Sequence, residues 1–149
     1  MFDALSLKIL QAQNECTLSW ITQDGSPAAT VVSFIYEQEC LWMTTPAGSV
    51  RERALMRDGR VAVVVSGKGC DLGDTRCVSM RGHCEILRDA ATRDMFFPLF
   101  ARKVLHKSRI GAPLMAKSMN TSANVVLKFT PSKVIPFDAQ KMMKVARFF

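Results

Sequence analysis

The sequence has none of the short motifs that mark the commonest hydrolytic and nucleotide-binding enzymes. It contains no G-x-S-x-G, G-x-G-x-x-G or P-loop pattern, so hydrolase, Rossmann and NTPase functions have no support. Its five cysteines are odd in number and include no C-x-x-C pair, which favours reduced thiols over a disulfide framework or a zinc ribbon. We therefore expect no metal site, and the residues alone identify no catalytic side chain.

Long apolar runs and a secretory leader are also missing. No apolar stretch approaches the roughly 18 residues that a membrane-spanning helix needs. Residues 1–4, Met-Phe-Asp-Ala, lack the basic segment that opens a signal peptide. These absences predict a protein that does not enter a membrane and that stays in the cytoplasm.

The chain has the length and composition of one globular domain, which we place at residues 1–149. Of its residues 48% are hydrophobic and 22% are charged, values that exclude disordered and low-complexity classes. Residues 1–74 hold 6 basic and 9 acidic side chains, whereas residues 75–149 hold 14 and 4. Such a basic half can attract nucleic acid, but a solvated basic surface is the simpler interpretation, so we expect no nucleic-acid partner.

The first third of the sequence predicts a helix followed by a three-stranded antiparallel meander. Apolar residues at helical spacing open the chain, and alternation of apolar and polar residues follows. Between the first two strands, Asp24 and Gly25 form a strong hairpin signal, because glycine accepts a positive φ without steric cost. The expected elements are a helix over residues 2–13 and strands over residues 16–21, 27–36 and 40–45.

The remainder of the sequence predicts further strands with small helices between them. Residues 60–65 form an unbroken apolar run, which predicts a strand buried on both faces. Pro98 lies inside a helical stretch that Asp89 caps, so we expect a break or kink there. Six or so antiparallel strands predict a mainly β protein, in which a closed barrel hides the edges of the sheet. The other expected elements are helices over residues 50–57 and 89–106 and after Pro113, and strands over residues 77–87, 125–129 and 134–137.

The segment from Thr44 to Arg51 is the most informative part of the sequence. It joins a strand to a helix whose start has the capping-box pattern, with Ser49 followed three residues later by Glu52. The first amides of a helix are unpaired and the helix dipole is positive there, so this place suits a phosphate. The hydroxyls of Thr44, Thr45 and Ser49 and the guanidinium of Arg51 could bind its oxygens, while ordinary helix capping is the alternative interpretation.

An ordered set of motifs spans nearly the whole chain, from about Ile9 to Asp138. A strand ending in Thr-Thr is followed by the Ser-x-Arg helix start, the Arg-Val-Ala-Val-Val-Val strand and the strand over residues 77–87. This order resembles the pyridoxamine 5′-phosphate oxidase-like family of flavin-binding split barrels. The resemblance implies a six-stranded antiparallel split β-barrel that forms a homodimer and binds FMN at the dimer interface. Small members of this superfamily include flavin reductases, F420-dependent reductases and haem-binding relatives, so F420 and haem are alternative cofactors.

The resemblance implies that the start of the predicted helix holds the flavin phosphate. Thr45 and Ser49 match positions that contact the phosphate and the ribityl chain in the family. Arg51 stands where the family often has lysine, and either cation can bind a phosphate, with different geometry.

The resemblance further implies that the backbone of Thr30, Val31 and Thr44 lines the flavin ring. Thr30 occupies the position of a phosphate-binding arginine in the oxidases proper, and Cys77 that of a glutamine that reaches the flavin. Neither replacement keeps the family's chemistry, since threonine carries no charge and a thiol is a poor substitute for an amide.

Two classes of function follow from the resemblance. The first is an FMN-dependent oxidoreductase with an unidentified small-molecule substrate, in which the flavin carries the electrons and the protein orients the reactants. The true oxidases also hold their substrate with an Arg-x-His element near the C-terminus. Residues 142–149 contain no such element, so we do not expect oxidation of vitamin B6 phosphates. The second class is a non-catalytic split-barrel module that stores flavin or binds haem or nucleic acid.

Overall fold

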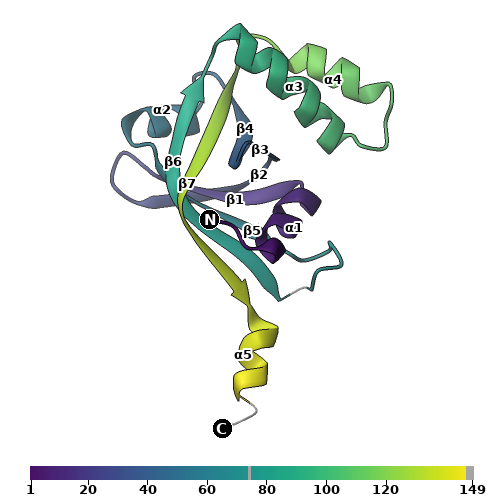
Figure 1. Ribbon diagram of the computed structural model, residues 1–149. Helices are drawn as coiled ribbons and strands as arrows, with labels where there is room; N and C mark the ends of the chain where they lie inside the picture. Colours follow the sequence, from purple (N-terminus) through teal and green to yellow (C-terminus); the bar gives the residue numbers. More distant parts are fainter. Residues whose placement is uncertain (74, 147–149) are drawn as a thin grey trace.

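The described strands form one curled antiparallel sheet, which is drawn in Figure 1. This computed structural model describes residues 1–73 and 75–146. The strands follow the order β2-β1-β5-β6-β7-β4-β3 across the sheet, so β2 and β3 are its two edges. The mainly β fold class is confirmed. The strands are β1 (Glu15–Ile21), β2 (Pro27–Ser33), β3 (Ile35–Glu37), β4 (Cys40–Pro46), β5 (Arg60–Ser66), β6 (Arg76–Leu87) and β7 (Asn124–Asp138).

The predicted strand over residues 27–36 is divided in two at Phe34, and this division changes the topology. Phe34 is fully buried, and its amide donates to the carbonyl of Asn14, so the chain turns into the core there. β2 stays paired with β1, whereas β3 pairs with β4 at the opposite edge of the sheet. The expected three-stranded meander is therefore wrong, and the described sheet has seven strands rather than six.

β7 is one 15-residue strand, although the sequence predicts two strands separated at Thr130 and Pro131. It pairs with β6 along its length, and a bulge opposite Arg81 and Gly82 absorbs one extra residue of β7. Because a bulge increases the local twist of a strand pair, it allows these two long strands to follow the curl of the sheet.

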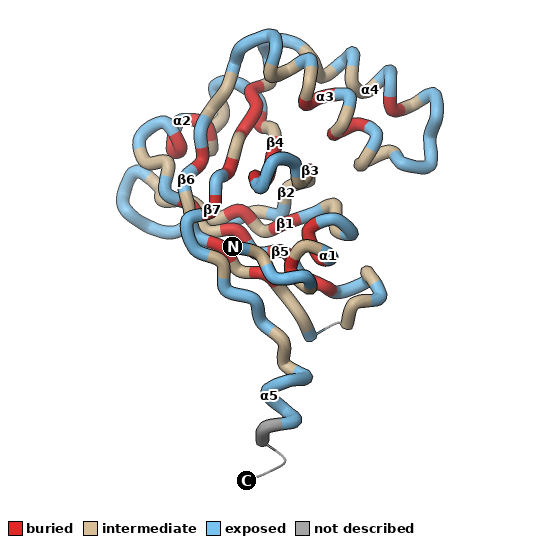
Figure 2. The backbone as a smooth tube through the Cα atoms, in the orientation of Figure 1, coloured by how far each residue is buried: buried red, intermediate tan, exposed pale blue. Residues whose placement is uncertain are grey.

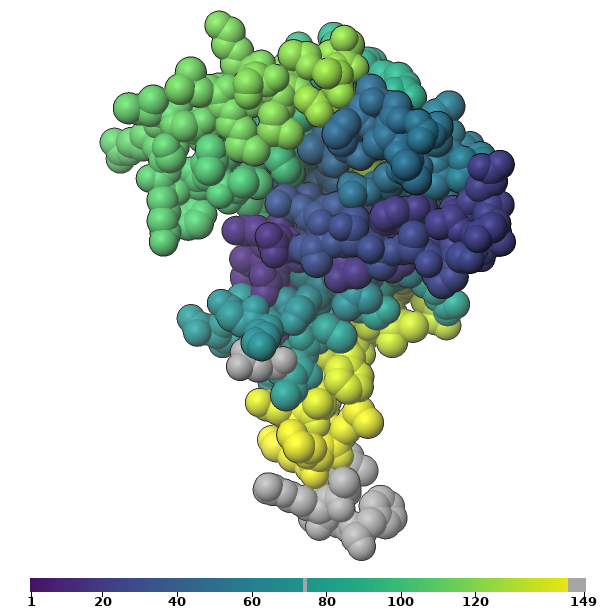
Figure 3. All heavy atoms as spheres, turned by 180° about the vertical axis from the view of Figure 1, so that it is seen from behind, coloured from purple at the N-terminus to yellow at the C-terminus, as the bar shows by residue number. Residues whose placement is uncertain are grey.

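Helices pack against the curled sheet and extend beyond it. Asp3, Ser49 and Asp89 cap the first three helices by accepting hydrogen bonds from backbone amides, as polar N-cap residues do. In Figures 1 and 3, α3 and α4 form a lobe at one end of the molecule, and α5, which the sequence did not predict, projects at the other. The helices are α1 (Ala4–Ala12), α2 (Val50–Arg57), α3 (Ala90–Val104), α4 (Gly111–Met119) and α5 (Ala139–Ala146).

None of these described helices has the apolar length that crossing a bilayer requires. The cytoplasmic location stays a prediction. Residues 147–149 lie outside the described residues. They end the C-terminal stretch that lacks the Arg-x-His element.

The main hydrophobic core fills the inside of the curl, where Figure 2 shows buried backbone along the inner strands. Leu18 of β1 and Met80 of β6 belong to it, together with Leu10 of α1. Burying each such side chain contributes about 1.5–3 kcal/mol to folding. The alternation predicted for the strand over residues 77–87 is confirmed, because Met80 and Cys84 are buried whereas His83 is exposed.

A second cluster attaches α3 to the outer side of the sheet. Phe96, Phe97 and Phe100 are buried against Trp42 of β4. The helix runs without a break through Pro98, so the predicted break is not found. Pro98 itself is exposed, and the buried phenyl rings on the other side of α3 hold the helix on the sheet despite the hydrogen bond that proline removes.

β5 is buried on one face only, which corrects the expectation that both faces are covered. Val61, Val63 and Val65 point into the core, whereas Val64 is 37% exposed. The apolar pattern predicted burial of both faces because the exposed residues of the strand are as apolar as the buried ones.

Candidate functional site

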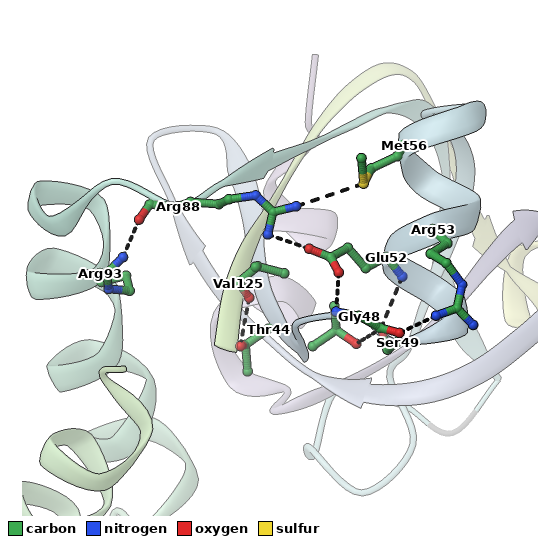
Figure 4. Close-up of polar contacts among 10 residues, drawn as sticks. Thr44, Gly48, Ser49, Glu52, Arg53, Met56, Arg88, Arg93 and Val125 are labelled. Atoms are coloured by element: carbon green, nitrogen blue, oxygen red, sulfur yellow. Dashed lines mark hydrogen bonds and ion pairs between the residues drawn. The ribbon is translucent and has the colours of Figure 1, made fainter. Parts of the chain in front are cut away.

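The loop between β4 and α2 places two hydroxyl groups side by side. Thr45 Oγ1 and Ser49 Oγ are 3.1 Å apart, and Thr45 is almost fully buried. Ser49 Oγ also accepts a hydrogen bond of 3.1 Å from the amide of Glu52, which is the N-cap that the sequence predicts (Figure 4). The structure therefore brings together two of the predicted phosphate-binding residues and also confirms the capping role.

Glu52 is the buried carboxylate that organises this loop. It accepts a hydrogen bond from the amide of Gly48, not from Ser49 as a reciprocal capping box would require, and it forms a 2.5 Å ion pair with Arg88 (Figure 4). Burial alone would raise the pKa of Glu52, but the Gly48 amide and the Arg88 guanidinium together lower it. The carboxylate is thus held ionised, with Arg88 balancing the negative charge that would otherwise repel an anion at the helix start.

The start of α2 leaves backbone donors open for such an anion. Within the described residues, the amides of Val50 and Arg51 have no hydrogen-bond acceptor, because the Ser49 side chain serves only the amide of Glu52. The positive end of the helix dipole adds to the attraction of negative charge at this point.

Arg51 does not extend into solvent but lies against Trp20 of β1. Its guanidinium carbon is 5.3 Å from the centre of the Trp20 ring, within the range of a cation–π contact. In the described part of the chain, Nε of Arg51 and Nε1 of Trp20 are both buried without a hydrogen-bond partner. Burial lowers the pKa of Arg51, although a guanidinium stays protonated at neutral pH. Two buried donors without acceptors make this a suitable place for an anionic or polar ligand group.

A hollow of about 730 Å³ lies between the β1–β2 turn and α2; Trp20 lines it, whereas Arg51, Thr45 and Ser49 do not. Trp20, Val50 and Arg53 belong to its walls, and Asp24 and Arg57 also line it. A volume of this size is in the range of small-molecule sites. The contact between Trp20 and Arg51 was not predicted, because no local pattern relates a residue before the Asp-Gly turn to one on the helix.

The other residues predicted to contact the flavin lie on β2 and β4. The structure brings them only partly to the β4–α2 loop. Thr30 is paired with the buried Leu18 and Val31 with Thr17, so the two β2 side chains face opposite sides of the sheet. Thr44 Oγ1 donates to the carbonyl of Val125 and is therefore engaged within the fold. β2 nevertheless contacts β4, although the two strands are not neighbours in the sheet.

Cys77 is not part of this cluster within one chain. It lies on β6, paired with Ser66 of β5 and Phe137 of β7, and it alternates with the buried Val78, so it faces outward. Burial raises the pKa of Cys77, which makes its thiol a weaker nucleophile than a free cysteine.

Comparison with known families agrees with this architecture. A family model described as pyridoxamine 5′-phosphate oxidase matches residues 3–137. The chain belongs to the pyridoxamine 5′-phosphate oxidase family. No curated protein matches the sequence significantly.

Solved structures share the fold with low sequence identity. A conserved hypothetical protein of Mycobacterium tuberculosis has a TM-score of 0.80 and 22% identity, covering 95% of this chain and 88% of its own. An F420 reductase has a TM-score of 0.70 and 17% identity, covering 91% and 98%. An FAD-binding protein of Mesorhizobium loti has a TM-score of 0.63 and 21% identity, covering 89% and 92%. At these identities the likeness establishes the split-barrel fold and leaves the cofactor of this pyridoxamine 5′-phosphate oxidase family member open.

Proposed function

We propose that this protein binds FMN at the start of α2 and acts as an FMN-dependent oxidoreductase on a small-molecule substrate. The observation that carries the proposal is the set of unpaired donors around Arg51 and Trp20, beside the helix start where the family resemblance implies a flavin phosphate. Family neighbours that are an F420 reductase and an FAD-binding protein support a cofactor of the flavin type.

Each residue of the site has a distinct part in this proposal. Thr45, Ser49 and Arg51 hold the phosphate, with the open amides of the helix start as further donors. The edge backbone of β2 at Thr30 and Val31 lies along the flavin ring, with Thr44 beyond it. When bound, the flavin supplies the electron chemistry, and the chain orients it and keeps water from one side of the site.

We expect Arg51→Ala to weaken FMN binding at least tenfold, a loss of about 1.4 kcal/mol, because a partly buried charged partner of the phosphate is removed. Riboflavin, which lacks the phosphate, should bind the variant and the original protein equally. Isothermal titration with both ligands measures the difference. Arg60→Ala is the matched control, since that side chain is 81% exposed and, among the described residues, its ion-pair partner is Asp58. If the Arg51 variant bound FMN as tightly as the original protein, the phosphate would not be held at the start of α2.

The cofactor itself is identified by what the purified protein carries. Heat release followed by mass spectrometry distinguishes FMN from FAD and F420, and an absorbance spectrum distinguishes them from haem. FMN supports the oxidoreductase proposal and F420 turns it into a deazaflavin-dependent reductase. A protein that takes up none of these cofactors would instead be the non-catalytic module.

We further propose that the protein is a homodimer, with the cofactor site at the interface. The outer face of the sheet carries a row of apolar and small residues that the described helices leave uncovered. Thr17 pairs with both Val31 and Val64, and Ser79 pairs with Val64 and with Ile135, so these residues adjoin across five strands. Val31 is 61%, Val64 37% and Ile135 44% exposed, and an exposed apolar row of this kind is typical of a surface that another protein covers. Cys77 lies at the start of β6, two residues before Ser79, where it lines a hollow with Leu5 and Ile9 of α1. We propose that it contacts the flavin from the partner's side of the interface.

We expect Val64→Lys to convert the dimer to a monomer, because it puts an unpaired charge at the centre of the buried face. Light scattering measures the mass directly. Ile110→Lys is the control, since Ile110 is more exposed but lies between α3 and α4, away from the sheet. A monomer in the original protein, or an unchanged dimer in the Val64 variant, would contradict this interface.

A further inference from the structure

A second hollow, of about 600 Å³, lies on a different side of the molecule from the α2 site. α1, β3 and α3 enclose it, and Figure 1 shows these three elements on the same side of the molecule. Its apolar surface comes from Ala12, Ile35 and Leu99, and Tyr36 and Glu37 of β3 complete that wall. The volume suits a ligand of a dozen or so heavy atoms rather than a single ion.

Three basic side chains of α3 and the turn after it line the same hollow: Arg102, Lys103 and His106. In the described residues no carboxylate is within ion-pair distance of any of them. Glu37 is the one acidic side chain among the lining residues, and it is exposed at the end of β3. The hollow therefore has an excess of positive charge over its apolar floor.

Lys103 is the fixed centre of this charge. Its Nζ lies 4.8 Å from the ring centre of the fully buried Phe34 and donates a 3.3 Å hydrogen bond to the carbonyl of Leu10, in the last turn of α1. One donor of the ammonium is thus used, and two remain. Burial lowers the pKa of Lys103, and the nearby Glu37 raises it to a lesser extent. A desolvated cation held in place without an anionic partner favours a ligand that brings one.

We propose that the hollow between α1, β3 and α3 binds a small organic carboxylate with an apolar or aromatic body. The carboxylate pairs with Lys103, the exposed Arg102 adds to the attraction, and His106 can donate a hydrogen bond. The body of the ligand covers Leu99 and Ile35. The proposal is independent of the flavin, since none of the residues assigned to FMN lines this hollow.

The two tryptophans of the chain report on the two sites separately. The indole of Trp42 donates a 3.0 Å hydrogen bond to the backbone carbonyl of Glu37, which lines the new site. Trp20 lies in the α2 site against Arg51. Titration of benzoate into the full chain, with and without FMN, should move the Trp42 indole N–H signal saturably in an NMR spectrum and leave that of Trp20 in place.

Matched ligands and variants test what binds. Benzyl alcohol, which lacks the charge, and inorganic phosphate, which lacks the apolar body, should each bind at least tenfold more weakly than benzoate. Lys103→Met keeps the aliphatic stem and should lower the benzoate affinity at least tenfold, whereas Lys107→Met, which lies outside the lining, should not change it. Arg102→Gln, at an exposed position, should lower it at least threefold even if the Lys103 variant fails to fold.

Several results would overturn the proposal. One is the absence of a saturable Trp42 shift with benzoate and with cyclohexanecarboxylate. Another is a shift of Trp20 instead, which would place the carboxylate in the α2 site. Equal binding of benzyl alcohol, or unchanged affinity in both the Lys103 and Arg102 variants, would show that charge does not select the ligand. Arg51→Ala should leave benzoate binding intact, so a failure of the FMN proposal does not affect this test.

Discussion

Glu52→Ala is expected to lower the free energy of unfolding by about 3 kcal/mol, because it removes a buried carboxylate that has both a charged and a backbone partner. Glu52 is only 4% exposed and holds the Gly48 amide and the Arg88 guanidinium. Without it, the Gly48 amide loses its acceptor and the half-exposed Arg88 loses its ion-pair partner. Urea denaturation, monitored by circular dichroism, measures the change. The slope of the unfolding free energy against urea concentration should be the same in the variant and the original protein, which shows that the transition stays two-state.

The same variant separates the two roles of the β4–α2 loop. Asp58→Asn is the control, because the exposed Asp58–Arg60 pair should contribute less than about 1 kcal/mol. Glu52→Gln keeps the shape of the side chain but not its charge. Its loss in free energy of unfolding should lie between those of Glu52→Ala and Asp58→Asn. If the helix start also holds a phosphate, FMN should restore part of the stability of Glu52→Ala through linkage between binding and folding. A loss below that of the Asp58 variant would contradict the buried role of Glu52.

Gly82→Ala is expected to destabilise the protein by about 3 kcal/mol or to prevent folding, because a methyl group there overpacks the backbone of the neighbouring strand. Gly82 lies at the bulge between β6 and β7. An added Cβ would collide with the carbonyl oxygen of Thr130 and lie 2.8 Å from the Cα of Pro131, and both obstacles are backbone atoms that cannot rotate away. Thermal unfolding by calorimetry measures the loss.

Gly25→Ala supplies the comparison for that variant. Gly25 has a φ of +83° in the β1–β2 turn, with open space around the position of a Cβ. Alanine there costs only the strain of the left-handed backbone, about 1 kcal/mol. If the two glycine variants proved equally stable, the β6–β7 strands would not approach as closely as the bulge requires.

Part of the candidate site could be read from neighbouring residues. The Ser49 cap, and a carboxylate three positions later, follow from residues within one helical turn, where geometry is set by the chain itself. The partners that make the site unusual are distant in sequence. Trp20 meets Arg51, and Arg88 meets Glu52, only because the sheet curls. Even the hydrogen bond of Glu52 differs from the capping-box pattern, since its carboxylate accepts from the amide of Gly48 and not from that of Ser49.

The sequence by itself determined the mainly β class, the positions of most strands and the helix start after β4. Alternation of apolar residues, Asp24–Gly25 and the Ser49 cap act over a few residues, so they do not depend on the rest of the fold. Only the tertiary structure decided the strand order, the division at Phe34 and the one-sided burial of β5. These depend on which faces meet across the core, and a local pattern carries no information about a partner far along the chain.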